Sequence, residues 1–584
     1  MDSSVDAESL MVVDVGSVST RAIFFDLVDG QYRFIATGSA PTTAVYPYSN
    51  VSEGVRLALD QLQTITGRTF IDDNQQLIIP SPGDGTGVDR FAATISVGEP
   101  LKVVIVGLLE DVSLESARRL ARSEYTNIVQ AISLNDRRRT DTRINTILRA
   151  RPDLIIAAGG TDGGASQSIL SILESVGLAG YLMPEKQQLA VFFAGNSSLT
   201  EEIKYRLDNI CDLHFAPNIR PTLELERLEA AETAFASLCT ELRIRQFLGM
   251  EELKAWSGEA MLPVPMAFSR IIRFLSKALN SKKGVLGLDI GASGINLTTS
   301  IDGRSSIHVY PEFGLGSNLK NILEQVAIPD ILRWVNEKIS QETLQEYLII
   351  KSMYPGSLPA SAGEMSIEHA ITRQMIQAAV KQASPEFPMD LLQISEDHLP
   401  LFEPILASGS VLSNCISPAE SAMILLDGLQ PVGVTTLILD QNHIAPAIGA
   451  AAFFSPMLAI QVMDSNSFLN LGTVIAPIAN VKIGLPILRI KLTYESGHES
   501  HLELNQGSLE VLPLPYGQTA RVQLQPLNKA DIGMGIAGRG GSITVKGGAL
   551  GVIFDGRGRP IRLPRDIERR LELQKKWLAD LGGQ

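Results

Sequence analysis

The stretch MVVDVGSVSTRAIFFDLVDG, residues 11–30, decides the fold. An apolar run, a turn of small and hydroxyl residues and a second apolar run predict a β-hairpin. Its polar tip holds Asp14, Gly16, Ser17, Thr20 and Arg21. Backbone N–H groups and hydroxyls at such a tip can bind phosphate oxygens, while a carboxylate can hold Mg²⁺ or its water. A plain polar hairpin is the alternative for this stretch taken alone.

The same pattern returns in GVLGLDIGASGINLTTSIDG, residues 284–303, with Asp289, Gly291 and Ser293 at its tip. Two such hairpins far apart in one chain predict two similar lobes that face one phosphate group. A third segment, LFEPILASGSVLSN at residues 401–414, ends an apolar run in a small-residue turn at Gly409 and Ser410. That turn suits close approach of the backbone to a nucleoside. In this order the segments resemble the phosphate-1, phosphate-2 and adenosine motifs of actin-like ATPases.

Length and composition limit the function classes. A chain of 584 residues is too long for one hydrophobic core, so several domains are expected. The formal net charge of −14 argues against a nucleic-acid partner. The three cysteines and seven histidines have no spacing typical of a structural zinc site. Scattered cysteines fit a reducing compartment, and the acidic N-terminus does not resemble a signal peptide, so a cytoplasmic protein is expected.

The stretch HIAPAIGAAAFFSPMLAI, residues 443–460, is almost uncharged and raises the question of a membrane span. It contains Pro446 and Pro456, is short for a span and lacks a flanking basic cluster. A buried helix packed through its small residues is the better interpretation, and no membrane partner is expected.

Strand-like and helix-like runs alternate over residues 101–221, which predicts a parallel sheet covered on both faces. Ligands of such sheets bind at the carboxyl ends of strands. Gly159, Gly160 and Asp162 follow one strand and open a helix, so they are candidates for anion binding. Tight turn geometry that demands glycine explains the same residues equally well.

Residues from 465 onward form short β-rich runs, which predict a separate β barrel or sandwich closed by a helix at 565–581. The predicted organisation is a disordered tail at 1–9, a first lobe with the βα sheet at 10–263, a second lobe at 264–462 and a β-rich domain at 463–584.

The strings VVDVGSVSTRAIFFDLVDG, LIIAAGGTDGG, VFFAGNS, GLDIGASGINL and ILASGSVLS resemble the MutL-type glutamate mutase accessory family. This family belongs to the actin-like ATPase superfamily and is found with adenosylcobalamin-dependent mutases. The resemblance implies an α/β, actin-like, ribonuclease H-like fold of two lobes, with a β-rich C-terminal domain added. It implies ATP and Mg²⁺ as cofactors and mutase subunits as partners, with a homodimer left open.

The resemblance also assigns roles by position. Asp14 and Asp289 would be the catalytic pair that holds Mg²⁺ and the attacking water. The other nucleotide-binding candidates are the phosphate-binding Gly16, Ser17, Thr20, Gly291 and Ser293, the adenosine-bordering Gly409 and Ser410, and in addition Arg21, Gly159, Gly160 and Asp162.

The implied function is that of an ATP-binding reactivating protein, whose weak Mg²⁺-dependent ATP hydrolysis drives a lobe movement. The second hairpin departs from the family pattern D-x-G-G-A-T-T-D at Ala292, Gly294, Ile295 and Asn296. Fewer hydroxyls and one lost carboxylate favour a nucleotide-binding scaffold without hydrolysis as the alternative. A small-molecule kinase of the same superfamily is the enzyme alternative, for which no catalytic aspartate can be assigned.

Overall fold

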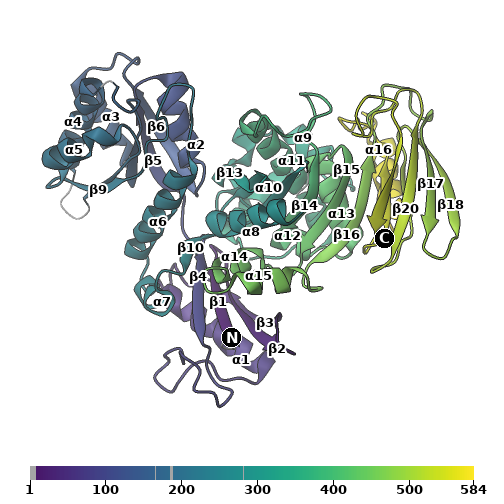
Figure 1. The fold of residues 1–584 in the computed structure, drawn as a ribbon, viewed down its shortest axis with the longest axis horizontal. Helices are drawn as coiled ribbons and strands as arrows, with labels where there is room; N and C mark the ends of the chain where they lie inside the picture. Colours follow the sequence, from purple (N-terminus) through teal and green to yellow (C-terminus); the bar gives the residue numbers. More distant parts are fainter. Residues whose placement is uncertain (1–7, 165, 184–187, 280–281, 584) are drawn as a thin grey trace, which may run out of the picture.

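A computed structural model describes residues 8–164, 166–183, 188–279 and 282–583 (Figure 1). Of the tail predicted at 1–9, residues 1–7 lie outside this range. Ser9 is described and buried, and its backbone N–H and hydroxyl donate to Oδ2 of Asp89 at 2.7 and 2.9 Å. The prediction of a tail that reaches residue 9 is therefore wrong, because these bonds tie Ser9 to the first sheet.

The first lobe is built on a five-stranded sheet in the order β10-β4-β1-β2-β3. The hairpin β1 (Leu10–Val15) and β2 (Ser19–Val28) continues antiparallel into β3 (Gln31–Pro41), and β1 pairs in parallel with β4 (Arg90–Ile95), which pairs with β10 (Met261–Pro263). Helix α1 (Val51–Thr66) covers one face; it begins at an Asn50 cap and ends at Gly67 in the left-handed conformation.

The second lobe repeats this arrangement. β11 (Gly284–Ile290), β12 (Ile295–Ile301) and β13 (Arg304–Tyr310) form the antiparallel part, and β14 (Phe402–Ser408) and β15 (Gly433–Asp440) add parallel strands. Helices α10 (Gln341–Met353), α11 (Ala362–Ala383) and α13 (Pro418–Leu429) belong to this lobe. The duplicated sheet order confirms the predicted actin-like α/β fold of two lobes.

Two helices cross between the lobes. α8 (Val264–Leu279) follows β10 of the first lobe but packs on β11 and β12 of the second, whereas α14 (Ala445–Ala451) follows β15 and packs on β1 and β4. One hydrophobic core is therefore shared by Leu10, Val12, Phe268, Leu406 and Ile448. The lobes are joined by an apolar interface rather than by a flexible linker.

The stretch at 443–460 forms α14 and part of a second helix, α15 (Pro456–Met463), which begins at a Ser455 cap. Every residue of α14 is buried, as predicted. Within the described part of the chain, no helix has the length and apolar character that a membrane crossing requires.

A second sheet is inserted between β4 and β10 and stands apart from the lobes at the upper left of Figure 1. Its strands are all parallel, in the order β6-β5-β7-β8-β9, and hydrophobic clusters cover both faces, as the alternating pattern predicts. Its strands are β5 (Leu101–Gly107), β6 (Thr126–Ser133), β7 (Leu154–Ala157), β8 (Leu189–Phe193) and β9 (Cys211–Phe215). Its helices are α2 (Glu115–Ala121), α3 (Thr140–Ala150), α4 (Gln167–Leu182), α5 (Thr200–Leu207) and α6 (Glu229–Gln246).

The tail is β-rich, as predicted, but it is divided between two sheets, and part of it joins the second lobe instead of forming one separate domain. β16 (Leu469–Ala476), β22 (Val552–Asp555) and β19 (Leu509–Leu512) extend the sheet of the second lobe beyond β15. β17 (Pro486–Tyr494), β18 (Glu499–Asn505), β20 (Thr519–Pro526) and β21 (Gly541–Lys546) form a sheet of their own. The physical reason is that β15 would otherwise present an unpaired edge.

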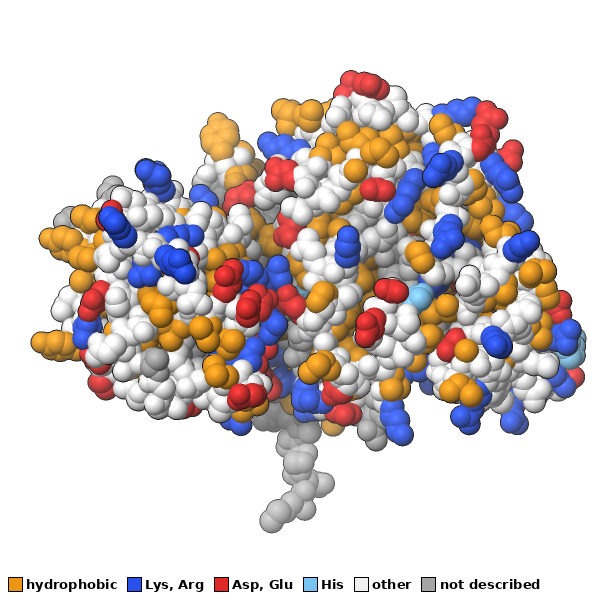
Figure 2. Space-filling view, turned by 90° about the horizontal axis from the view of Figure 1, so that it is seen from above, with side chains coloured by type: hydrophobic (Ala, Val, Ile, Leu, Met, Phe, Trp, Pro, Cys, Tyr) orange, Lys and Arg blue, Asp and Glu red, His pale blue; other side chains and the backbone are white. Residues whose placement is uncertain are grey.

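The remaining helices are short except for the last. They are α7 (Met250–Ser257), α9 (Ile328–Leu332), α12 (Ser410–Ser413) and the terminal α16 (Ile567–Asp580). On the face of the molecule drawn in Figure 2, basic and acidic side chains are intermixed and separated by hydrophobic and neutral surface.

Candidate functional site

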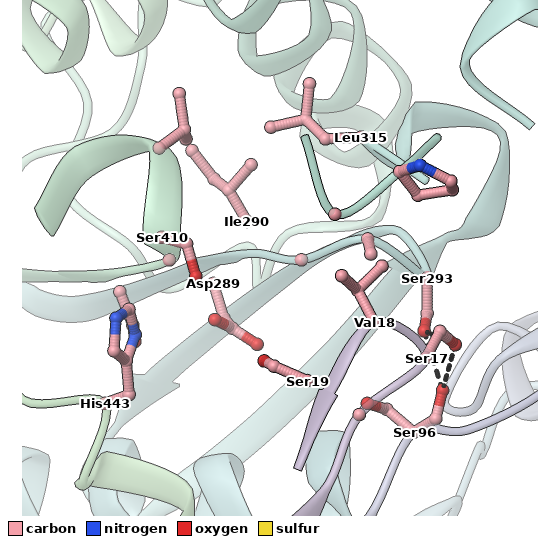
Figure 3. A pocket seen from close by; sticks show the side chains of 18 of the residues that line it. Ser17, Val18, Ser19, Ser96, Asp289, Ile290, Ser293, Leu315, Ser410 and His443 are labelled. Atoms are coloured by element: carbon pink, nitrogen blue, oxygen red, sulfur yellow. Dashed lines mark hydrogen bonds between the residues drawn. The ribbon is translucent and has the colours of Figure 1, made fainter. Parts of the chain in front are cut away.

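The tips of the two hairpins meet at one cleft between the lobes. The Oγ atoms of Ser17 and Ser293 lie 2.7 Å apart, and both lie within hydrogen-bond distance of the backbone oxygen of Ser96, at 2.9 and 2.6 Å (Figure 3). The cavity beside them has a volume of about 500 Å³. Segments 276 residues apart in the chain therefore form one wall.

Both tips have the same turn geometry. The N–H of Gly16 donates to the backbone oxygen of Ser19 at 3.1 Å, and the N–H of Gly291 donates to that of Gly294 at 3.0 Å. A Cβ at Gly16 would lie 2.8 Å from the Ser19 oxygen, so the first turn requires glycine. The repeated geometry explains why the two sequence motifs look alike.

Carboxyl groups lie at the carboxyl ends of three strands. Asp14 is the second-last residue of β1, with Oδ1 accepting from Thr94 at 2.8 Å and Oδ2 lying 3.4 Å from Nη1 of Arg21. Asp289 lies near the end of β11, and Asp440, which ends β15, accepts from the N–H groups of residues 444 and 445 at 3.0 and 2.8 Å.

The acidity of these groups is strongly perturbed. Burial, with the charges of Asp14 and Asp440 added, raises the pKa of Asp289 to about 7. Burial also raises the pKa values of Asp14 and Asp440, against the lowering effect of Arg21. Crowded carboxylates of this kind are stabilised by a bound cation, and their all-oxygen donor set fits Mg²⁺.

Cationic side chains also line the cleft. Arg21 reaches from the first lobe to the second, with Nη2 donating to Oγ of Ser410 at 3.0 Å. Nζ of Lys351, on α10, lies 3.0 Å from Oε2 of Glu368 and donates to the backbone oxygen of Ser357 at 2.5 Å. Next to an acidic centre, these charges suit the phosphates of an anionic ligand.

The opposite wall is formed by the turn after β14. Gly409 has a φ of +128°, and a Cβ there would lie 2.3 Å from the backbone oxygen of Ile290. Only glycine allows α12 to begin this close to β11. Ser410 and Val411 then face the cavity together with residues 355–358 of the loop after α10.

Most of the predicted site residues meet in this cleft. Those that line it are Asp14, Gly16, Ser17, Arg21, Asp289, Gly291, Ser293, Gly409 and Ser410. Lining residues that the sequence did not single out include Ser96, Tyr125, Lys351, Glu368 and His443. These five lie on helices and loops outside the three motifs, and no spacing connects them to the hairpins.

Thr20, predicted to bind phosphate, lies outside the cleft. It is fully buried, and its Oγ1 lies 2.9 Å from Oγ1 of Thr42. Successive residues of a strand point to opposite faces, so Ser19 and Arg21 face the cavity and Thr20 faces the interior of the lobe.

Gly159, Gly160 and Asp162 also lie elsewhere, at the carboxyl edge of the inserted sheet. Nδ2 of Asn218 donates to the backbone oxygen of Gly160 at 3.0 Å and to Oδ1 of Asp162 at 2.9 Å. A Cβ at the neighbouring Gly195 would lie 2.5 Å from the Gly159 oxygen. Close packing of turns accounts for these residues, which the structure does not bring to the interlobe cleft.

The chain is similar to known proteins over most of its length. A family model described as MutL protein matches residues 10–467. Protein MutL of Clostridium tetanomorphum is 21% identical over 449 residues, covering 70% of this chain and 94% of that protein.

Two solved structures are similar over most of the chain. Nucleotide-free acetone carboxylase is 10% identical with a TM-score of 0.31, covering 86% of this chain and 81% of that one. The ATP-dependent caprolactamase from Pseudomonas jessenii is 12% identical with a TM-score of 0.29, covering 85% and 81%.

Proposed function

Since the chain belongs to the MutL protein family, we propose that it is an ATP-binding accessory protein that reactivates an adenosylcobalamin-dependent mutase such as glutamate mutase. The observation that carries the nucleotide part of the proposal is the contact between the two hairpin tips beside Asp14 and Asp289. The mutase as partner rests on the family resemblance.

The residues of the cleft have complementary roles toward Mg·ATP. Asp14 and Asp289 hold the metal ion and orient the attacking water. Ser17, Ser293 and the backbone N–H groups of both tips bind phosphate oxygens, with Arg21 and Lys351 supplying positive charge. The metal ion, when bound, neutralises charge that develops on the phosphates. Gly409 and Ser410 border the adenosine.

The contacts across the cleft suggest how nucleotide binding moves the lobes. The Ser17–Ser293 contact and the Arg21–Ser410 bond both join the first lobe to the second. A phosphate group between the tips replaces the hydroxyl contact with bonds from each hydroxyl to phosphate oxygens. Loss of the terminal phosphate reverses that exchange, so the lobe spacing differs between the two states.

A thermal shift experiment tests the nucleotide site. Mg·ATP at 100 times its Kd stabilises the wild type by about 2.7 kcal/mol, and Asp14→Ala loses this stabilisation. Thr20→Val is the matched control, because Thr20 follows the cleft residue Ser19 on β2 but faces the interior. Equal stabilisation of Asp14→Ala and the wild type would overturn the proposed site.

The accessory role needs a separate assay. A mutase holoenzyme inactivated during turnover should recover activity when this protein and Mg·ATP are added. No recovery should occur with Asp14→Ala. Recovery without nucleotide, or none with the wild type, would contradict the role while leaving the nucleotide site intact.

A nucleotide-binding scaffold without hydrolysis is the second candidate. The turn between Gly291 and Asn296 supplies one hydroxyl, that of Ser293. Asn296, which stands where the family pattern has an acid, is fully buried, and its Oδ1 accepts from Thr298 at 3.0 Å. The change from acid to asparagine therefore affects the interior of the lobe. A thermal shift with Mg·ATP but no release of phosphate would favour the scaffold.

A further inference from the structure

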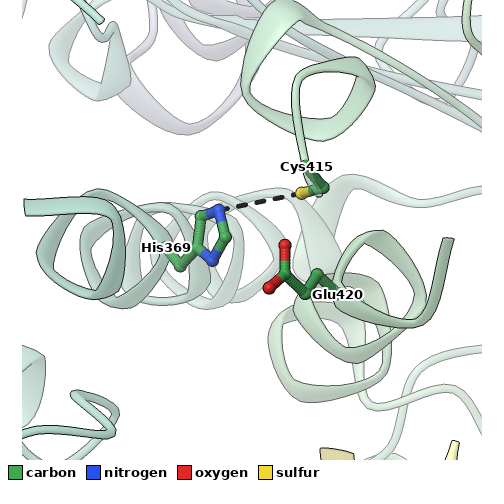
Figure 4. Close-up of side chains that lie close together, drawn as sticks. All are labelled: His369, Cys415 and Glu420. Atoms are coloured by element: carbon green, nitrogen blue, oxygen red, sulfur yellow. Dashed lines mark hydrogen bonds between the residues drawn. The ribbon is translucent and has the colours of Figure 1, made fainter. Parts of the chain in front are cut away.

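Three potential metal ligands lie together behind the wall of the cleft (Figure 4). His369 on α11, Cys415 after α12 and Glu420 on the first turn of α13 each offer one ligand atom, and these atoms lie within 4.8 Å of one another. The side chains come from three separate segments and are all half-buried. We propose that His369, Cys415 and Glu420 bind one zinc-type divalent ion, with a fourth position left to water.

The geometry is close to what zinc requires. Bond lengths of about 2.3 Å to sulfur and about 2.1 Å to nitrogen place those two atoms about 3.6 Å apart in a tetrahedral site. Sγ of Cys415 lies 3.7 Å from Nε2 of His369. The ligand oxygen of Glu420 lies within 4.8 Å of both atoms, so an adjustment of its side chain completes the set.

Existing contacts leave the ligand atoms usable. Oε2 of Glu420 accepts from the N–H of Ile416 at 2.9 Å, which leaves the other carboxylate oxygen for the ion. The Cys415 thiol lies 3.3 Å from the backbone oxygen of Val411 as well as near His369, and its single proton can be donated to only one of them. An ion therefore replaces a weak hydrogen bond.

The space beside the cluster and the charges of its ligands favour a bound ion. A cavity of about 40 Å³, lined in part by His369 and Glu420, adjoins the cluster and can hold a water as fourth ligand. One thiolate and one carboxylate balance the charge of a divalent ion, so the three together bury no net charge. The nearby Arg373 is paired with Asp427 at 2.8 Å. Sulfur and imidazole ligands select zinc over Mg²⁺.

The protonation states define a consequence of binding. Burial, with the charge of Arg373 added, lowers the pKa of His369 to about 3, so its ring is neutral and has a lone pair to donate at neutral pH. Burial, opposed by a hydrogen bond from Ser421 and aided by Glu420, raises the pKa of Cys415 to about 12. Binding therefore displaces the thiol proton to solvent, one per ion.

Location suggests what the ion does. Glu368, which precedes His369, and Asn414, which precedes Cys415, both line the nucleotide cleft. An ion at this site fixes the turn after α12 against α11. The cluster is invisible in the sequence because its ligands are separated by 46 and 5 residues.

Titration of the full chain with Co²⁺ tests the proposal, because cobalt reports its ligands by absorption. The wild type should bind one equivalent with tetrahedral visible bands and a thiolate-to-cobalt band in the near ultraviolet, and Zn²⁺ should displace it. Cys415→Ser should lose the thiolate band and weaken Zn²⁺ binding more than about 100-fold, exceeding the effect of losing an outer-shell partner. His369→Gln should weaken binding similarly.

Cys211→Ser, which alters a buried cysteine of the inserted sheet, is the control and should keep the band. A wild-type spectrum without the thiolate band would overturn the proposal whether or not the variants fold. A band that survives in Cys415→Ser would also overturn it. Neither result depends on nucleotide binding.

Discussion

Asp14 and Asp289 bring carboxyl groups from different lobes into one buried place. Burial is the main cause of the raised pKa of Asp289, and the charges of Asp14 and Asp440 add to it, so this pKa rises to about 7. Without a bound cation, the folded protein must either keep a proton on Asp289 or hold negative charges close together in a buried place. A bound metal ion therefore lowers the electrostatic free energy of this site.

Asp289→Asn should stabilise the metal-free protein at pH 8. Because the folded-state pKa is raised, the protonated group contributes stability below pH 4 that is lost as pH rises through 7. The advantage of the variant over the wild type should grow by about 3 kcal/mol between pH 5 and pH 8. Melting temperatures at the two pH values, without Mg²⁺ or nucleotide, measure this change.

Asp302→Asn is the control, since Asp302 is exposed in the turn between β12 and β13 and tolerates asparagine. This variant measures how the loss of one exposed carboxyl group changes the melting temperature at the two pH values. A pH-independent difference for Asp289→Asn would show that its carboxyl is ionised throughout this range.

At the residue scale, the sequence predicts those site residues that lie in recognisable turns. The tips of both hairpins and the Gly409 turn were predicted to share a site, and they line one cleft. Thr20 was assigned wrongly because a motif lists residues without saying which face of the strand each one takes. Lys351 and Glu368 could not be predicted, because they come from helices whose docking depends on long-range packing.

At the scale of elements, the crossed helices α8 and α14 join the lobes. A Cβ at Gly449 of α14 would lie 1.9 Å from the backbone oxygen of Ala267 on α8, so the two backbones are in direct contact. The sequence indicated a buried helix rich in small residues but not its partner. The sequence did not predict that the helix is interrupted at Ser455, which caps a second helix, α15, beginning at Pro456.

Gly449→Ala should destabilise the protein although alanine is the better helix former. The added methyl group forces α14 away from α8, at a cost of about 3 kcal/mol or more. Gly363→Ala is the matched control: Gly363 also lies in a helix, but its nearest obstacle is the end of a Glu337 side chain at 3.2 Å. Thermal melting compares the two, and equal melting temperatures would contradict the close contact.

At the scale of the whole molecule, the tail completes the second lobe. Leu471, Val474 and Ile553 of the tail belong to the core of that lobe. Buried Arg557 pairs with Asp427 of α13 at 2.7 Å. Short β-rich runs fit a separate barrel as well as an extended sheet, and only the long-range pairing of β16 with β15 decides between them.

A chain truncated after residue 462 should therefore lose the folded second lobe. Truncation leaves β15 unpaired and Asp427 without its Arg557 partner, which costs several kcal/mol. Loss of a cooperative melting transition, followed by circular dichroism, is the expected result. Unchanged melting after truncation at 462 would support an independent tail.

The central claim is that both hairpins hold the same Mg·ATP, and a mutant cycle of binding tests it most directly. The Kd of Mg·ATP is measured at pH 8 for the wild type, Asp14→Asn, Asp289→Asn and the double variant. Each single variant should bind at least about tenfold more weakly, and the double variant little worse than either, because both carboxylates act on one ion. The claim would be contradicted if the fold-loss of affinity in the double variant equalled the product of the two single losses. It would also be contradicted if either single variant bound Mg·ATP as tightly as the wild type.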